Sequence, residues 1–164
     1  MFNLTLAKKL GAANAWTILK VGVDDEKMPL SNGVYDPRSS KWVYGESNSS
    51  RIGTLDRDIC TYYDDAIEQI FYTPQINLEN ISIREIELDT IAGFTVDDAS
   101  VFMSMSYDGV AYGKEQSLAY GSNSSHNLRF GAYRMGRVNK DFNFRFRTTS
   151  KSRMVFSKLT VKYG

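Results

Sequence analysis

The stretch FNFRFR, residues 142–147, alternates phenylalanine with polar or cationic side chains along its whole length. Successive side chains of a β-strand point to opposite faces, so the three rings would share one face and Asn143, Arg145 and Arg147 the other. A surface that binds single-stranded nucleic acid needs its aromatic and cationic side chains on the same face. The alternation instead predicts a strand whose rings belong to a sheet core and whose arginines lie on the exterior.

Similar alternation occurs through much of the chain, and turn residues interrupt it roughly every eight to twelve positions. SVFMSMS, residues 100–106, is followed by Asp108 and Gly109, the strongest hairpin signal in the sequence. Short strands at this spacing are typical of a β-sandwich or barrel. We predict an all-β fold: an antiparallel, jelly-roll-like two-sheet sandwich over residues 65–164, preceded by short propeller-like strands.

Two of the expected strands change phase partway along. In ISIREIEL, residues 81–88, the apolar set shifts by one position after Ile83, and in MVFSKLTVKY, residues 154–163, it shifts after Phe156. Because a shift of one residue exchanges the two faces of a strand, each stretch is expected to contain a β-bulge or to cross between sheets at a sandwich corner.

Residues 1–64 have a different character. NGVYDPRSSKWVYGESNSSRIGTLD, residues 32–56, indicates very short strands, the pattern of one four-stranded propeller blade. LAKKLGAANAW, residues 6–16, lacks a sustained helical period, and we interpret it as a strand followed by a turn. A single blade cannot bury its own faces, so this region is expected to be the end of a truncated β-propeller, with a boundary near Tyr62 to Asp65.

Charge is unevenly distributed in a chain whose formal net charge is +1. Residues 46–98 carry twelve acidic and three basic side chains, whereas the residues from His126 onward carry ten basic side chains and one acid. Such blocks can pair inside one fold, which we place first, or between identical subunits arranged head to tail. The candidate protein-interface residues are Arg129, Arg134, Arg137, Arg145, Arg147, Glu85 and Glu87.

The residue types that support catalysis or metal binding are scarce. Cys60 is the only cysteine and His126 the only histidine, so an internal disulfide is excluded and a zinc site is unsupported. Glu85 and Glu87 share a strand face, and an enzymatic interpretation would require them to face a cleft instead of solvent. We predict no cofactor, no metal and no catalytic residue, and no segment long and apolar enough to enter a membrane.

Longer stretches of the second half carry a family resemblance: MSMSYDGVAYGKEQSLAYG at 103–121, the R-x-G-R segment at 134–137 and the F-x-F-R strand. With the turn from Ser106 to Gly113, they resemble the carboxyl-terminal region of the packaged-DNA stabilization, or tail hub (nozzle), proteins of short-tailed bacteriophages. Residues 16–22 and 34–47 resemble the closing blade strands that precede this region in such proteins.

The resemblance implies a structural virion protein, made in the host bacterial cytoplasm and located in the phage tail. In that family a β-propeller joined to a jelly-roll-like sandwich forms a homo-oligomeric ring below the portal. The implied partners are other tail proteins, namely the portal or adaptor, the tail needle and the tailspike, with non-specific contact to packaged DNA. The resemblance carries no catalytic residue, and it implies that the protein helps to retain packaged DNA.

A carbohydrate-binding β-sandwich is the alternative function. In such a module Tyr107, Tyr112 and Tyr120 would cluster on one exposed face and stack on sugar rings. The structural role instead expects some of these tyrosines to be buried and others to lie at a subunit contact.

Overall fold

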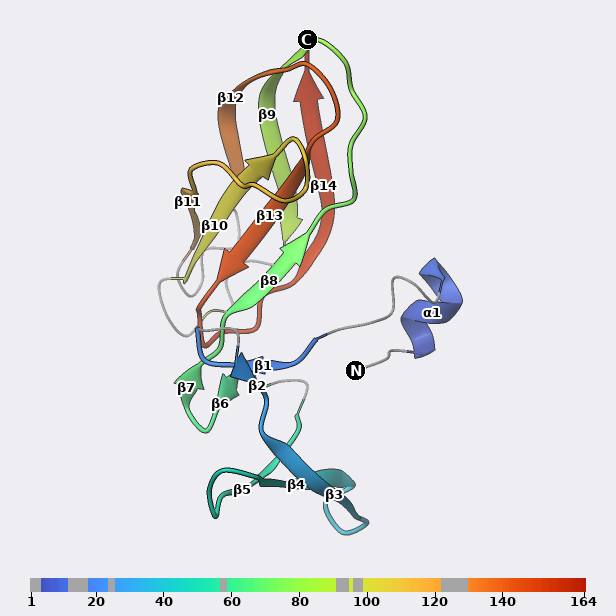
Figure 1. The fold of residues 1–164 in the computed structure, drawn as a ribbon, viewed down its shortest axis with the longest axis vertical. Helices are drawn as coiled ribbons and strands as arrows, with labels where there is room; N and C mark the ends of the chain where they lie inside the picture. Colours follow the sequence, from blue (N-terminus) through green and yellow to red (C-terminus); the bar gives the residue numbers. More distant parts are fainter. Residues whose placement is uncertain are drawn as a thin grey trace. The chain divides into compact units, whose positions relative to one another are not determined.

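The computed structural model describes residues 4–11, 18–23, 26–56, 59–90, 95, 99–121 and 130–164. The chain divides into two compact units, Met1–Asp56 and Arg57–Gly164, which are considered separately (Figure 1). Among the described residues no helix is long and apolar enough to span a membrane. The candidate interface residue Arg129 and the only histidine, His126, lie outside the described ranges.

The first unit begins with a helix where the sequence analysis predicted a strand. Helix α1 spans Leu4–Leu10, and that prediction was wrong. Its residues are mostly leucine, alanine and lysine, which have high intrinsic helix propensity, and this preference outweighs the missing amphipathic period. The helix is followed by Gly11, whose φ of 88° suits glycine and whose N–H donates to the carbonyl of Ala7 at 3.0 Å.

The remaining elements of the first unit are short antiparallel strands. β3, β4 and β5 pair in sequence order as a three-stranded sheet, on which the ring of Trp42 contacts the rings of Tyr35 and Tyr44. The four-stranded blade stays a prediction, because β1 and β2 form a separate pair. The strands of this unit are β1 (Lys20–Val21), β2 (Glu26–Lys27), β3 (Leu30–Asp36), β4 (Lys41–Glu46) and β5 (Ile52–Thr54).

The second unit contains two antiparallel sheets, with strand orders β11-β10-β13-β8 and β12-β9-β14, and a small β6–β7 hairpin. In Figure 1 the four-stranded sheet lies in front of the three-stranded sheet. The strands are β6 (Thr61–Tyr62), β7 (Asp65–Ala66), β8 (Gln69–Tyr72), β9 (Ile81–Thr90), β10 (Ala99–Ser106), β11 (Gln116–Gly121), β12 (Gly131–Val138), β13 (Asn143–Thr148) and β14 (Phe156–Tyr163).

The core lies between these two sheets, and it confirms the predicted two-sheet sandwich. The three phenylalanines of FNFRFR are at most 1% exposed, as the alternation predicted. β10 adds Val101 and Met103, and the three-stranded sheet contributes Ile83, Ile86 and Leu88 from its central strand β9. Burial of this apolar surface is the main source of stability for the unit.

The predicted changes of phase are β-bulges. In the β9–β14 ladder Glu85 pairs with Lys162 and Ile83 with Tyr163, which leaves Arg84 as an extra residue in β9. In the same ladder Ser157 is extra in β14. Each bulge falls where the apolar set shifts, because the extra residue restores the inward direction of the side chains that follow.

Candidate interaction surface

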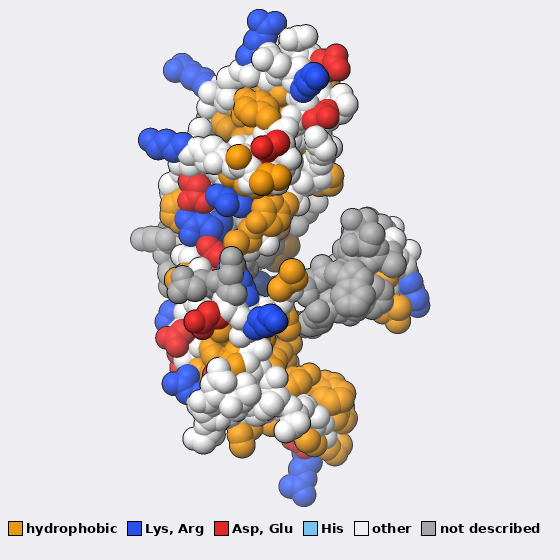
Figure 2. Space-filling model, in the orientation of Figure 1, with side chains coloured by type: hydrophobic (Ala, Val, Ile, Leu, Met, Phe, Trp, Pro, Cys, Tyr) orange, Lys and Arg blue, Asp and Glu red, His pale blue; other side chains and the backbone are white. Residues whose placement is uncertain are grey.

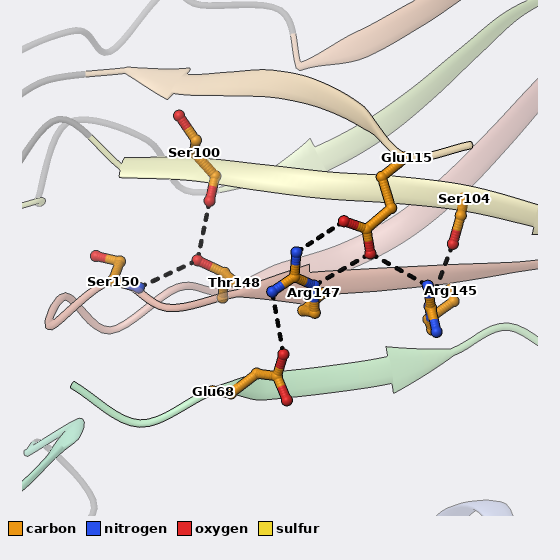
Figure 3. Close-up of polar contacts among 8 residues, drawn as sticks. All are labelled: Glu68, Ser100, Ser104, Glu115, Arg145, Arg147, Thr148 and Ser150. Atoms are coloured by element: carbon orange, nitrogen blue, oxygen red, sulfur yellow. Dashed lines mark hydrogen bonds and ion pairs between the residues drawn. The ribbon is translucent and has the colours of Figure 1, made fainter. Parts of the chain in front are cut away.

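The outer face of the four-stranded sheet carries a compact network of ion pairs around β13. Arg147 donates from Nε to Oε1 of Glu115 at 3.1 Å and from Nη2 to Oε2 at 2.7 Å, the two-point geometry that favours arginine with carboxylate. Its Nη1 also donates to Glu68 at 3.2 Å. Glu115 accepts a third bond from Nη2 of Arg145 at 3.1 Å, so one carboxylate lies between two guanidinium groups (Figure 3).

These contacts change the acidity of the groups involved. The hydrogen bond from Arg147, together with the nearby positive charges, lowers the pKa of Glu115 although partial burial opposes the shift. Glu115 in turn raises the pKa of Arg147. Both side chains are therefore charged throughout the neutral pH range, and the charge of each is balanced by the other.

Aromatic rings complete this surface on either side of the ion pairs. The guanidinium of Arg145 lies 4.7 Å from the ring centroid of Tyr112, and that of Arg147 lies 4.9 Å from the ring of Phe102. Tyr72, which is 56% exposed, lies 5.8 Å from Tyr112 between ring centroids. Figure 2 shows acidic, basic and hydrophobic side chains intermingled over the four-stranded sheet. Arginine and tyrosine of this kind are enriched in protein interfaces.

The loop that carries Tyr112 is ordered by one carboxylate. Oδ1 of Asp108 accepts hydrogen bonds from the N–H groups of Val110 and Ala111, both at 2.8 Å, and from the hydroxyl of Ser106. These bonds lower the pKa of Asp108. The predicted hairpin at this position joins β10 to β11, through a loop longer than a two-residue turn. Asn143 fixes the ring of Tyr112, because Nδ2 of Asn143 donates to the hydroxyl of Tyr112 at 3.1 Å.

The outer face of the three-stranded sheet divides into a paired region and an unpaired one. Nζ of Lys162 lies 3.0 Å from Glu85 and 3.1 Å from Glu87, so both predicted acids are bound within the sheet. Arg134 and Arg137 are exposed on β12, and among the described residues they form no ion pair.

The sequence analysis missed Glu68 and Glu115, the two acids that bind the arginines of the four-stranded sheet. Alternation shows which face of a strand a side chain occupies. It does not show which acidic residues outside the strands come to lie against that face.

The opposite charge blocks of the sequence pair inside the fold at several points. Glu68 with Arg147, and Glu85 and Glu87 with Lys162, each join the acidic region to the basic one. The intramolecular pairing that we placed first is thus present. Arg145 and Arg147, proposed as interface residues, have their charges occupied within their own sheet.

The three tyrosines expected of a carbohydrate-binding module do not share an exposed face. Tyr107 is 56% exposed, but Tyr120 is 1% exposed, and its hydroxyl accepts a hydrogen bond from Thr90 at 2.6 Å. Tyr120 is therefore a core residue and cannot stack on a sugar. Its position two residues after Leu118 in a strand was the signal for an inward side chain.

An apolar groove of about 670 Å³ lies along the open side of the sandwich. Its walls come from the edge strands β8 and β14, with Phe71 and Phe156 in ring contact at 4.9 Å and Leu88 beneath. Glu85 and Glu87 do not line this groove. Both carboxylates instead contact Lys162 on the outer face of the three-stranded sheet.

Comparisons with known proteins agree with this architecture. The family model described as the β-sandwich of bacteriophage P22 Gp10 matches residues 68–164, a range that includes every strand of both sheets. The tail hub protein gp10 of Salmonella phage P22 is 24% identical over 147 residues, which amount to 90% of this chain and 31% of that protein. The chain thus spans about a third of the length of the relative that it matches.

Proposed function

This chain belongs to the bacteriophage P22 Gp10 β-sandwich family, and from that membership we propose that it is a structural component of a phage tail hub. Its place is the tail of the virion. The observation that carries the proposal is the extent of the family match, because it covers the complete sandwich and not a single motif.

We further propose that the sandwich binds neighbouring tail proteins and thereby helps to retain packaged DNA. Arginine and tyrosine side chains on a rigid sheet support a binding role, since they lose little conformational freedom on association. The internal ion pairs around Glu115 support a structural role for that face: they hold both arginines in place, and the guanidinium of Arg145 lies over the ring of Tyr112. Portal or adaptor, needle and tailspike proteins are the proposed partners.

The proposal is tested in a phage that encodes this chain. We expect the chain in purified virions by mass spectrometry, and we expect a deletion of residues 57–164 to give heads that fill with DNA and then lose it. Nuclease-protected DNA per particle measures that loss. Absence of the chain from intact virions, or normal DNA retention by the deletion mutant, would contradict the proposal.

A further inference from the structure

In the described part of the second unit, three arginines of the three-stranded sheet form no ion pair, whereas Arg145, Arg147 and Lys162 are held by carboxylates. Arg84, Arg134 and Arg137 are exposed, and within the described part of the chain none of their side chains forms a hydrogen bond or an ion pair. By contrast, the guanidinium groups of the four-stranded sheet are held by Glu115. We call these three residues the bulge arginines.

The register of the sheet brings the bulge arginines to one place. Tyr133 pairs with Glu85, and the next pair is Gly136 with Ile83, so Arg84 on β9 and Arg134 on β12 lie within the same irregular step of the ladder. Arg137 follows at once, directly opposite Ser82. Figure 2 shows Lys and Arg side chains projecting from the end of the sandwich that holds β12 and the C terminus.

The strained backbone at Arg134 supports a functional role for the bulge arginines. Arg134 has a φ of 57°, in the left-handed region that disfavours every residue with a Cβ atom, and Gly136 has a φ of 93°. Glycine would satisfy position 134 with less strain, yet the position carries an arginine. Strained residues and β-bulges gather at functional sites, where they redirect side chains.

The chemistry of the surroundings selects the kind of partner. Guanidinium groups bind carboxylates and phosphates at two points. The same outer face also carries Glu85 and Glu87, which share the single ammonium of Lys162. An extended polyanion such as duplex DNA, lying across this face, would meet these carboxylates and be repelled. A compact acidic cluster on a protein can contact the bulge arginines alone.

We propose that the bulge arginines form a docking site for a carboxylate-rich segment of a partner protein. The identification of that partner as a tail protein rests on the proposed function, whereas the binding chemistry does not. A chain that binds acidic peptide but is absent from virions would defeat only the proposed function. A chain present in virions that binds no acidic peptide would defeat only the docking site.

The experiment is an NMR titration of the ¹⁵N-labelled chain with a twelve-residue peptide of alternating aspartate and glutamate. We expect saturable shifts confined to the amides of residues 81–85 and 133–138 and to the arginine Nε–H signals. The double variant R84Q/R137Q should bind roughly tenfold more weakly, because two screened charge pairs are lost. The matched control is R38Q, an exposed arginine of the first unit, which should bind like the parent.

A second variant separates charge from backbone strain. Arg134→Gly should also weaken binding, but its thermal unfolding midpoint should be equal to or higher than that of the parent, since glycine tolerates the left-handed backbone. The proposal is overturned if the peptide causes no shifts, if the shifts are the same in R84Q/R137Q, or if a twelve-base-pair DNA duplex at equal concentration and salt shifts the same amides more strongly.

Discussion

Arg147 and Glu115 meet at two points on the outer face of the four-stranded sheet, although 32 residues separate them in sequence. The contact joins the C-terminal end of β13 to the residue that precedes β11. Because Glu115 also accepts from Arg145, its carboxylate is the single anion on which both guanidinium groups converge. This face therefore depends on Glu115 more than on either arginine.

Replacing Glu115 by glutamine should lower the free energy of unfolding by about 1 kcal/mol, the range of a well-oriented, partly exposed ion pair. The neutral amide leaves Arg145 and Arg147 to repel each other. Urea unfolding followed by the NMR amide signals of β13 measures the change, since both tryptophans precede residue 57 and do not report on this unit. Glu79→Gln, at an exposed acid, should change stability little; an equal loss in both variants would contradict the role of Glu115.

The contribution of Glu115 should disappear in acid. Its folded-state pKa is lowered below the ordinary value of 4.5, mainly by the hydrogen bond from Arg147. A lowered pKa gives stability that is complete above the unfolded value and is lost as pH falls through the folded value. The stability difference between the parent chain and Glu115→Gln should thus be constant near neutral pH and shrink below about pH 4.5. A difference that grows in acid would contradict this.

The rings of β13 should be among the most sensitive positions of the chain. Phe144 is fully buried and lies between Phe142 and Phe146, with ring centroids 5.4 and 6.2 Å away. Phe144→Ala should lower the free energy of unfolding by about 3–5 kcal/mol, through lost burial and the cavity that remains. Val110, which is 83% exposed, provides the control as Val110→Ala. If the two variants had the same urea midpoint, the result would contradict a core role for Phe144.

Periodicity predicted the sandwich because it depends on neighbouring residues alone. The alternation of FNFRFR identified the buried face, and the phase changes after Ile83 and Phe156 identified the two bulges of the β9–β14 ladder. The partner of Arg147 could not be found in this way, since it depends on how the loop after β10 returns across the sheet. Helix α1 was missed because a short run of helix formers needs no amphipathic period.

Gly131 lies where the backbone of β9 leaves no room for a side chain. A Cβ atom at this position would lie 2.5 Å from the carbonyl oxygen of Ile86, inside the contact limit. That carbonyl belongs to β9, the central strand, which is bonded to β12 on one side and β14 on the other and cannot move aside. Gly131→Ala should therefore cost about 1–3 kcal/mol of stability, the usual range for forced overpacking.

Gly113 is the matched control for this substitution. A Cβ atom there would lie 3.5 Å from the carbonyl oxygen of Met105, an ordinary van der Waals distance. The loop amide of Gly113 keeps its 2.9 Å bond to that oxygen in either variant. Gly113→Ala should shift the urea midpoint much less than Gly131→Ala, when both are followed by the amide signals of β9. If the two substitutions cost the same, the close approach of β12 to β9 does not limit side-chain size at position 131.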